Sequence, residues 1–314
     1  MNCHSFIFIV YIYNELSNKS TVTHFARIVR KRTVMEALYI GENVEVDERL
    51  KNVINRFYYV SAHEIDTAIA YHYPPSLEMM IIFNFGPPIR CSFGESDVYD
   101  QSLEKIAVIG PLRTIMNYEL APCSELVVLP FIFDGFYRFL SLSIEGLSGG
   151  KLSEHEVSEY NSSLEKIWKA LAELPTNAER VVWMSNYLIK HLNPSSQGAL
   201  PLLDSIPYLN SAFNPVKVIA QDHDVSERTI QKRFKKYTGY SPKELIRFLR
   251  FKQIITYISG KELKDIDWFE VIYKFDYHDQ SHLNKDFKYF TGTSPAKFIS
   301  LNLQRNFCFH PDDQ

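Results

Sequence analysis

Two nine-residue segments of the chain are nearly the same, and they limit what its C-terminal third can fold into. The first nonamer, FKKYTGYSP, spans 234–242, and the second, FKYFTGTSP, begins 53 residues later and spans 287–295. Six of the nine positions are identical. In each nonamer an amphipathic basic run reaches a Gly suited to a left-handed helix C-cap, and Ser-Pro then opens another helix. The repeat therefore predicts two tandem helical modules.

The residues before the first nonamer predict a helix, a tight turn and a second helix. Asp224 stands where the turn needs a residue that accepts a positive φ, which Asp tolerates less well than Gly. Ser226 is placed to cap the second helix. The inward face of that helix is predicted to carry Ile230, Phe234 and Tyr237.

The opposite face of the second helix is polar and cationic. It is predicted to carry Arg228, Gln231, Lys232, Lys235 and Lys236. Arg, Gln and Lys side chains match the base edges and phosphates of a DNA major groove. A solvated helix face would have a similar composition, but the turn and the repeat together favour DNA binding.

A long helix and a second helix pair follow. The long helix is predicted over Pro242–Ser259, and the pair over Ile266–Phe275 and Asp279–Phe290, with Asp276 at the turn. The outward residues expected on the last of these helices are Gln280, Ser281, His282, Asn284 and Lys285.

The N-terminal half predicts a different architecture. Short strand-like runs are broken by Gly-Pro and Ala-Pro pairs, as in a small barrel or sandwich. The runs are Arg56–Val60, Met79–Phe85, Ile106–Ile109, Thr114–Glu119 and Glu125–Pro130. Helices are expected over Ser153–Glu173 and Asn177–His191, and they would cover this domain or form a dimer contact. The fold class is therefore α+β: a β-rich, barrel-like domain with following helices, then an all-α domain of two helix-turn-helix units joined by a long helix.

Several aromatic residues of the β-rich half could line a ligand pocket, or could simply fill its core. They are Tyr58, Tyr71, Tyr73, Phe83 and Phe85. The four cysteines are scattered without CxxC spacing, which argues against a zinc site or a disulfide framework. We predict no metal, no cofactor and no catalytic residue.

Net charge separates the two parts of the chain. Residues 213–303 carry 16 Lys and Arg against 11 Asp and Glu, a net charge of +5, whereas the remaining residues carry 18 against 26. A basic C-terminal third on an acidic body is typical of a polyanion-binding module fused to another domain. The apolar run near the N-terminus is too short to span a membrane, so we expect a cytoplasmic protein without a membrane partner.

With these features the chain resembles the AraC/XylS family of bacterial transcription regulators. The resemblance covers Val216 to about Ile299 and is carried by VSERTIQKRFKKYTGYSP and YHDQSHLNKDFKYFTGTSPAKF. Two departures stand out. Asp224 and Asp276 replace the usual Gly of the turns, and Ile272 occupies a position where the first unit has the small Ala220. The motif IleGlyPro at 109–111 is similar to the sensor domain of some members.

The resemblance implies two sets of DNA contacts. Bases would be met by Arg228, Gln231, Lys232, Gln280, Ser281, His282, Asn284 and Lys285. Phosphates would be met by Ser226, Thr229, Lys235, Lys236, Arg247, Arg250 and Lys288. It also implies double-stranded DNA as the partner, with RNA polymerase, a small-molecule effector and a second copy of the chain as further candidates.

The predicted organisation has five segments, and the role of the second is left open. They are an extension at 1–34, a β-rich domain at 35–192, a linker at 193–212, a DNA-binding domain at 213–303 and a tail at 304–314. The β-rich domain would sense a small molecule, or bind none and serve in dimerisation or protein contact. An enzymatic role is the remaining alternative, although HExxH and Gly-rich phosphate-loop motifs are missing from the sequence.

Overall fold

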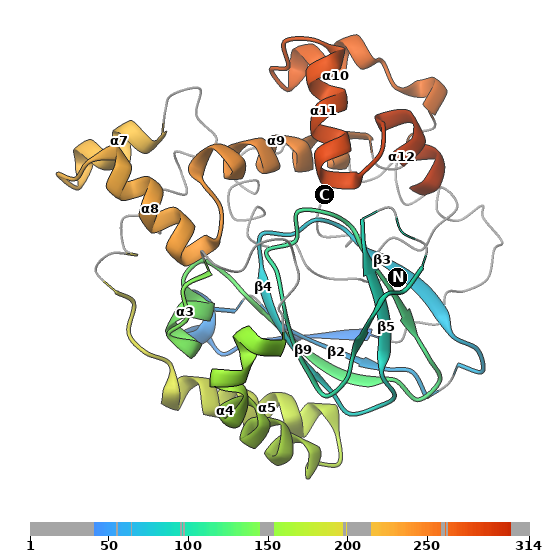
Figure 1. Ribbon diagram of the computed structural model, residues 1–314, viewed down its shortest axis with the longest axis vertical. Helices are drawn as coiled ribbons and strands as arrows, with labels where there is room; N and C mark the ends of the chain where they lie inside the picture. The colour runs from blue at the N-terminus through green and yellow to red at the C-terminus, as the bar shows by residue number, and fades with distance from the viewer. Residues whose placement is uncertain are drawn as a thin grey trace.

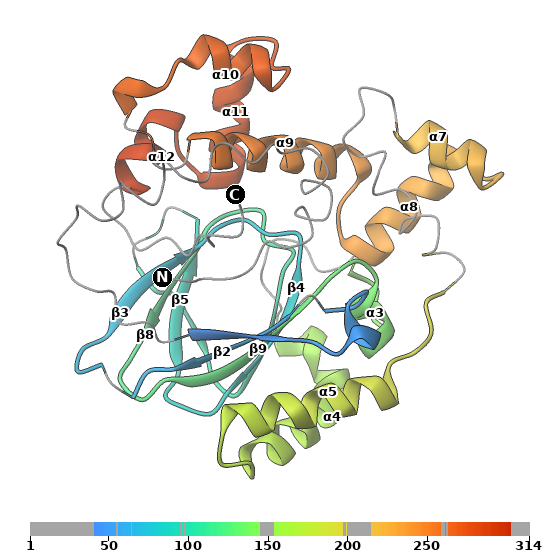
Figure 2. The ribbon, with the colours of Figure 1, turned by 180° about the vertical axis from the view of Figure 1, so that it is seen from behind.

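The computed structural model describes residues 41–144, 154–196, 199, 215–258, 261 and 263–302, apart from residues 55, 64, 95 and 97. The extension expected at 1–34, most of the linker at 193–212 and the tail at 304–314 lie outside the described residues. Figures 1 and 2 show a β-rich N-terminal domain below and a helical C-terminal domain above it.

The N-terminal domain is a sandwich of two antiparallel sheets. In the part of the chain that the structure describes, the larger sheet has the strand order β1-β2-β9-β4-β7 and the smaller sheet β3-β8-β5-β6. The strands are β1 (Gly41–Glu45), β2 (Arg56–Ser61), β3 (Ile69–Tyr73), β4 (Met79–Asn84), β5 (Ile89–Phe93), β6 (Gln101–Leu103), β7 (Ile106–Ile109), β8 (Met116–Leu120) and β9 (Glu125–Phe131).

Each face of the larger sheet is covered by a separate apolar layer. Alternate residues of β4 divide between them: Met80 and Ile82 point toward the smaller sheet, whereas Ile81 and Phe83 point toward the helices. Because both faces are covered, β4 is buried along its whole length and shows none of the polar alternation of a half-exposed strand.

Three helices cover the outer face of the larger sheet (Figure 1). They are α3 (Gly135–Leu140), α4 (Glu154–Ala172) and α5 (Asn177–His191). The buried Arg180 of α5 donates to the Glu125 carboxylate at 2.6 Å and stacks on the Phe85 ring. The Trp168 indole donates to the carbonyl of Asn84 at 2.8 Å. The predicted helical hairpin therefore covers the sheet.

The C-terminal domain contains two helix-turn-helix units separated by a long helix. Its helices are α7 (Pro215–Asp222), α8 (Glu227–Thr238), α9 (Pro242–Ile258), α10 (Trp268–Lys274), α11 (Gln280–Thr291) and α12 (Pro295–Asn302). One short 3-10 turn, η5 (Leu263–Asp265), lies between α9 and α10, and another, η2 (Glu48–Leu50), follows β1 in the N-terminal domain. We call α7 and α8 the first unit and α10 and α11 the second unit. The predicted α+β fold class is confirmed.

Candidate nucleic-acid interface

The turn of the first unit depends on Asp224. Its φ is +49°, the left-handed conformation that the sequence required at this position. Ser226 then caps α8, because its side chain accepts a hydrogen bond from the Thr229 amide at 3.1 Å. Val225 donates its amide to the carbonyl of Ala220 at 2.9 Å, which closes the turn. This geometry places α8 as the second helix of the unit.

The two faces of α8 differ as the periodicity predicted. Ile230, Phe234 and Tyr237 are buried in a cluster with residues of α7 and α9. Arg228, Gln231 and Lys232 are exposed, as is Lys235 one turn further on. The exposed face offers guanidinium, amide and ammonium groups that can hydrogen-bond to base edges and phosphates.

The second unit repeats this construction. Asp276 has φ +54° and occupies the turn, and Asp279 caps α11 by accepting the His282 amide at 2.7 Å. That backbone hydrogen bond is the main reason why the pKa of Asp279 lies below its ordinary value, with His278 adding to the effect. Ile272, in place of a small residue, is partly buried against the apolar cluster of this unit.

The outward face of α11 carries the second predicted set of base contacts. Gln280, Ser281, Asn284 and Lys285 are exposed. His282 is only partly exposed, because its ring packs edge-on against Tyr277, with centroids 4.8 Å apart. Amide and ammonium groups thus dominate the accessible chemistry of this helix.

The seven residues predicted to contact phosphates are placed differently from one another. Lys235, Lys288 and Ser226 are exposed, and Thr229 is partly exposed. Lys236, Arg247 and Arg250 instead have partners inside the protein. Lys236 lies over the Tyr137 ring, with Nζ 4.8 Å from its centroid, and hydrogen bonding to Tyr137 raises the pKa of Lys236. Arg250 donates to the carbonyl of Asp276 at 3.2 Å.

Arg247 belongs to a buried polar network that joins α9 to α11. Its Nε donates to the Asp286 carboxylate at 2.5 Å, and the same carboxylate accepts the Tyr277 hydroxyl at 2.7 Å. Asp286 is fully buried, and burial followed by this hydrogen bond raises the pKa of Tyr277 well above its ordinary value. Arg247 thus fixes α11 to the long helix α9.

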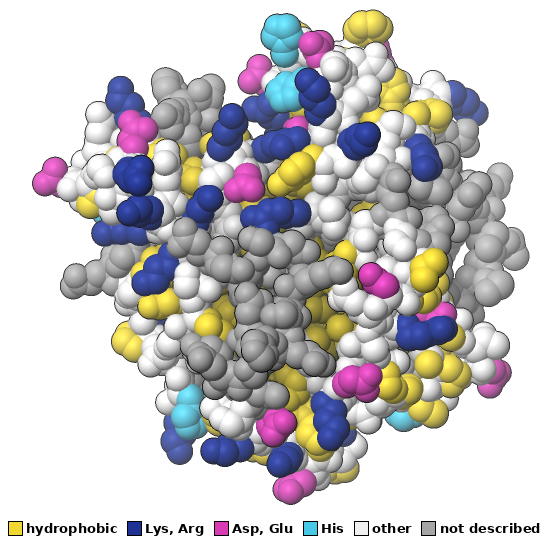
Figure 3. Space-filling view, viewed as in Figure 1, with side chains coloured by type: hydrophobic (Ala, Val, Ile, Leu, Met, Phe, Trp, Pro, Cys, Tyr) yellow, Lys and Arg dark blue, Asp and Glu magenta, His cyan; other side chains and the backbone are white. Residues whose placement is uncertain are grey.

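Side chains of one charge gather on the face that carries these helices. Lys and Arg side chains stand over α8, α9 and α11 on the face shown in Figure 3, with few acidic side chains among them. The exposed cations of the three helices include Arg228, Lys232, Lys235, Lys243, Lys285 and Lys288. A cationic face of this kind attracts the DNA backbone.

The aromatic residues proposed as a ligand pocket do not form one group. Tyr58, Tyr71 and Tyr73 pack against the apolar layer between the two sheets, and Tyr71 stacks on Tyr118. Phe83 and Phe85 lie on the other face of the larger sheet, in the layer beneath α4 and α5. The structure therefore separates the tyrosines from the phenylalanines, and only the tyrosines face the interior of the sandwich.

Comparison with known proteins identifies the C-terminal domain. A family model described as a helix-turn-helix domain matches residues 219–300, which contain α8 to α11. This part of the chain is an AraC-type DNA-binding domain. The chain is accordingly a transcription regulator that binds DNA through this domain, as the resemblance to the AraC/XylS family implied.

Solved structures similar to this chain include two of ToxT and one of CuxR. ToxT from Vibrio cholerae O395 is 14% identical, with 83% of this chain and 97% of that chain covered, at a TM-score of 0.34. Unsaturated fatty acid-bound ToxT from Vibrio cholerae strain SCE256 is 12% identical, covering 85% and 97%, at 0.32. The AraC-like transcriptional activator CuxR is 14% identical, covering 71% and 82%, at 0.22. A search of curated proteins found no match.

Two further findings concern the described residues of this regulator. No helix among them is both long and apolar enough to span a bilayer. Sequence reasoning missed four residues that join the two domains. They are Arg113, Tyr137, Tyr240 and Glu244. One signal pointed to Tyr240: it is among the positions at which the two nonamers differ.

Proposed function

We propose that the AraC-type domain reads a specific DNA sequence by placing α8 and α11 in successive major-groove segments of one duplex. The observation that supports this most strongly is the duplication itself: two capped helices, each with an exposed face rich in hydrogen-bonding side chains, stand on a common helix. The 17 residues of α9 span about 26 Å. Major-groove segments on one face of DNA recur every ~34 Å, so slight bending would bring both helices into place.

We assign base reading to the exposed residues of the two helices. In the first unit these are Arg228, Gln231 and Lys232, and in the second Gln280, Ser281, His282, Asn284 and Lys285. Arg and Lys suit guanine, whereas Gln and Asn suit adenine. Phosphate contacts are assigned to Ser226, Thr229, Lys235 and Lys288. We withdraw Lys236, Arg247 and Arg250 from that set, since their internal contacts support structural roles.

The decisive test is a binding titration of the full chain on its own upstream DNA and on a random duplex of equal length, at two salt concentrations. We expect at least about a hundredfold preference for the upstream DNA, a threshold set below the ~10³–10⁷ that is usual for specific binding. Arg228→Ala should reduce the preference at particular base pairs by about 1–3 kcal/mol. Lys235→Ala should weaken binding to both duplexes alike and reduce the salt slope by about one.

Lys190→Ala is the matched control, because Lys190 is an exposed cation on α5 of the N-terminal domain, and its loss should change binding to neither duplex. Equal loss of affinity on both duplexes for Arg228→Ala and Lys235→Ala would contradict the division into base and phosphate contacts. Equal, steeply salt-dependent binding of the wild-type chain to both duplexes would leave a phosphate-binding module without sequence preference.

For the N-terminal domain we propose sensing of a small molecule between the sheets, where Tyr58, Tyr71 and Tyr73 provide an apolar lining with polar ends. The alternative is a role in dimerisation or protein contact. One observation favours it: Val182 on the outer side of α5 is 61% exposed. A thermal-shift screen against small metabolites separates these roles, because a ligand that binds the folded domain raises its melting temperature. No shift with any metabolite, together with a dimer in solution, would favour the alternative.

The remaining assignments follow from DNA binding. We propose that the protein acts in the cytoplasm, where bacterial DNA lies, that it contacts RNA polymerase at its promoter, and that it catalyses no reaction.

A further inference from the structure

The two nonamers differ at three positions, and in the first unit all three of these residues face the N-terminal side of the molecule. The differing residues are Lys236, Tyr237 and Tyr240, which correspond to Tyr289, Phe290 and Thr293 in the second nonamer. Lys236 lies over the Tyr137 ring of α3. Tyr237 packs edge-on against the same ring, with centroids 5.0 Å apart, and its hydroxyl is 2.6 Å from the hydroxyl of Ser196.

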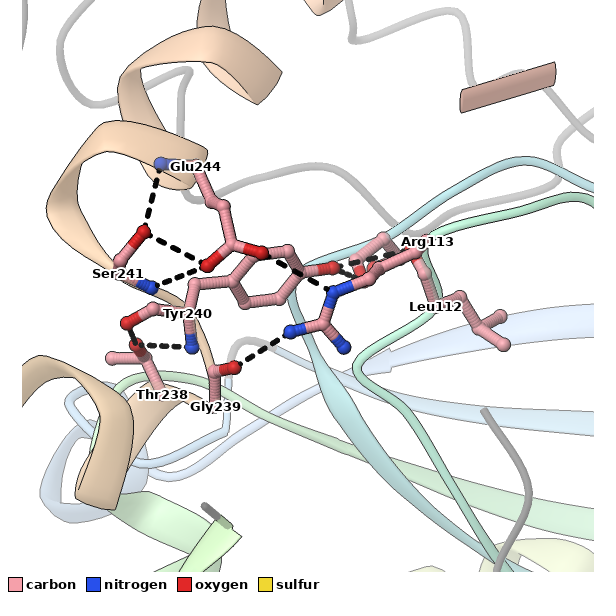
Figure 4. Close-up of polar contacts among 8 residues, drawn as sticks. Leu112, Arg113, Thr238, Gly239, Tyr240, Ser241 and Glu244 are labelled. Carbon is pink, nitrogen blue, oxygen red and sulfur yellow. Dashed lines mark hydrogen bonds and ion pairs between the residues drawn. The ribbon is translucent and has the colours of Figure 1, made fainter. Parts of the chain in front are cut away.

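Tyr240 makes the deepest of these contacts (Figure 4). The side chain is almost completely buried, and its hydroxyl points at two backbone carbonyls of the N-terminal domain, those of Leu112 at 3.2 Å and Ser76 at 3.3 Å. Burial raises the pKa of the Tyr240 hydroxyl, so it stays a proton donor throughout the physiological range.

Arg113 of the N-terminal domain contacts the segment that carries Tyr240. Its guanidinium lies over the Tyr240 ring, 4.6 Å from the centroid, and donates to the carbonyl of Gly239 at 2.9 Å. It also faces the Glu244 carboxylate at 3.6 Å. Burial opposes the charge of Glu244, but hydrogen bonds from Ser241 and the charge of Arg113 together lower its pKa. One arginine of the N-terminal domain therefore contacts both the end of α8 and the start of α9.

In the second unit the corresponding residues have other partners. Arg247 of α9 stacks on the Tyr289 ring at 4.3 Å and lies near the Phe290 ring at 5.5 Å. Phe290 also contacts Phe248 and Phe251 of α9. The three unlike positions thus attach the first unit to the N-terminal domain, whereas in the second unit two of them, Tyr289 and Phe290, contact the long helix.

The segment that receives Tyr240 also reaches the second unit. Between β7 and β8, Pro111 lies close to Gly239, while Ile115 is buried in the apolar cluster formed by α9, α10, α11 and α12. One loop of the N-terminal domain therefore touches both units. The base-reading residues Arg228, Gln231 and Lys232 stay exposed in this arrangement, so the contact leaves the DNA-binding face of α8 accessible.

We infer that the N-terminal domain positions the first recognition helix relative to the second, with Tyr240 and Arg113 as the positioning residues. This inference rests on the proposed binding of both helices to one duplex. Its consequence is measurable: the distance between the two half-sites in DNA should be strictly specified while the contact is intact, and less strictly once it is broken.

The test replaces the first nonamer by the second, through Lys236→Tyr, Tyr237→Phe and Tyr240→Thr in the full chain. This sequence already forms a helix stop elsewhere in the same protein. Arg113→Ala breaks the contact from the N-terminal side. Tyr59→Phe is the control, because it removes a tyrosine hydroxyl that bonds to Glu42 of β1 within the N-terminal sandwich and not at the contact between the two domains. Thermal melting confirms that each variant is folded.

The probe is a duplex selected by the wild-type chain from a random library, and two derivatives with one or two base pairs inserted between the half-sites. Each inserted pair moves the second half-site by about 3.4 Å. We expect wild type and Tyr59→Phe to lose affinity at least about tenfold on the longer duplexes, comparable to a mismatch. The triple variant and Arg113→Ala should bind the original duplex more weakly and lose far less on insertion. Combining the triple variant with Arg113→Ala should change the dependence on spacing little further, because both break the same contact between the two domains.

An unchanged spacing profile in the triple variant and in Arg113→Ala would overturn the inference while leaving the proposed function intact. Tighter binding of these variants to the original duplex would also overturn it, since the contact would then hold the helix away from its DNA geometry. If wild type itself binds all three duplexes equally, the two-helix function fails, and the inference fails with it.

Discussion

Thr238 and Gly239 of the first nonamer and Thr291 and Gly292 of the second make the same local contacts. Each threonine hydroxyl donates to the carbonyl four residues earlier at 2.7 Å, and each glycine has a left-handed φ, +73° and +78°. Where the two nonamers differ, the contacts differ as well: Tyr240 of the first unit contacts the N-terminal domain, and Tyr289 of the second unit contacts α9. The shared residues set the shape of the helix stop, and the unlike residues set what it is attached to.

The attachments also differ in chemistry. In the second unit a buried carboxylate is paired with Arg247 and Tyr277 inside the C-terminal domain. In the first unit the carboxylate of Glu244 is partly exposed, and its ion pair with Arg113 is longer, at 3.6 Å. The second unit should therefore be the more firmly attached, and the first the one whose position depends on a separate domain.

Arg247→Ala, on the long helix that holds the second unit, should lower the stability of the fold more than Gly239→Ala or Arg113→Ala, which affect the first unit. We expect the free energy of unfolding to fall by about 3 kcal/mol, because the substitution leaves the carboxylate of Asp286 buried without a cation. Urea denaturation measures the loss, and Lys243→Ala, an exposed cation on the same helix, should change stability little. A loss below about 1 kcal/mol would mean that Asp286 needs no charged partner.

Gly239→Ala should cost about 2 kcal/mol and Gly292→Ala about 1 kcal/mol, because both force alanine into a left-handed conformation. The additional cost at Gly239 has a specific cause. A Cβ there would lie 2.6 Å from Ile144 Cγ2 and 2.7 Å from Pro111 Cγ, atoms outside the C-terminal domain. Thermal denaturation of the two variants measures the difference, and equal costs would show that Gly239 is not closely packed.

Arg113→Ala should cost about 1 kcal/mol, since a partly exposed ion pair contributes little and the hydrogen bond to the Gly239 carbonyl supplies most of the effect. The comparison with Arg247→Ala in the same urea series tests whether the second unit is the more firmly attached. A larger loss for Arg113→Ala than for Arg247→Ala would reverse that conclusion.

The helix caps should give the smallest effects, and they differ in pH dependence. Ser226→Ala should cost about 0.5 kcal/mol at any pH, because a hydroxyl cap does not titrate. The lowered pKa of Asp279 means that its cap stabilises the fold above the ordinary carboxyl pKa of about 4 and fades as pH falls through the folded value. Asp279→Ala should therefore destabilise at pH 7 and converge with wild type in acid; a pH-independent difference would contradict an ionised cap.

Local rules predicted most of the C-terminal domain. Both turns with positive φ, both Gly C-caps and the Ser226 cap depend on residues close in sequence, and all were confirmed. The strands were harder to predict, because a strand that is covered on both faces lacks the alternation of polar and apolar residues. The strands β2, β4, β7, β8 and β9 were predicted within about two residues at each end. The edge strand β1 and the strands β3, β5 and β6 of the smaller sheet were not singled out.

The roles of single cations could not be predicted in the same way. Periodicity shows which side of a helix faces away from its own unit, but not which other element lies opposite. Lys236 meets Tyr137, a residue 99 positions earlier, and Arg247 meets Asp286 of another helix. The pocket aromatics show the same limit, since Tyr58 and Phe83 lie on opposite faces of one sheet.

The cationic face over α8, α9 and α11 belongs to a chain whose other residues are acidic overall. The molecule therefore has opposite charges at its two ends, and the field of a DNA duplex turns it as it approaches. The acidic end is repelled and the recognition helices are drawn in first, so a larger share of diffusional collisions occurs in a productive orientation. The association rate, more than the lifetime of the complex, should then fall as salt rises and screens that field.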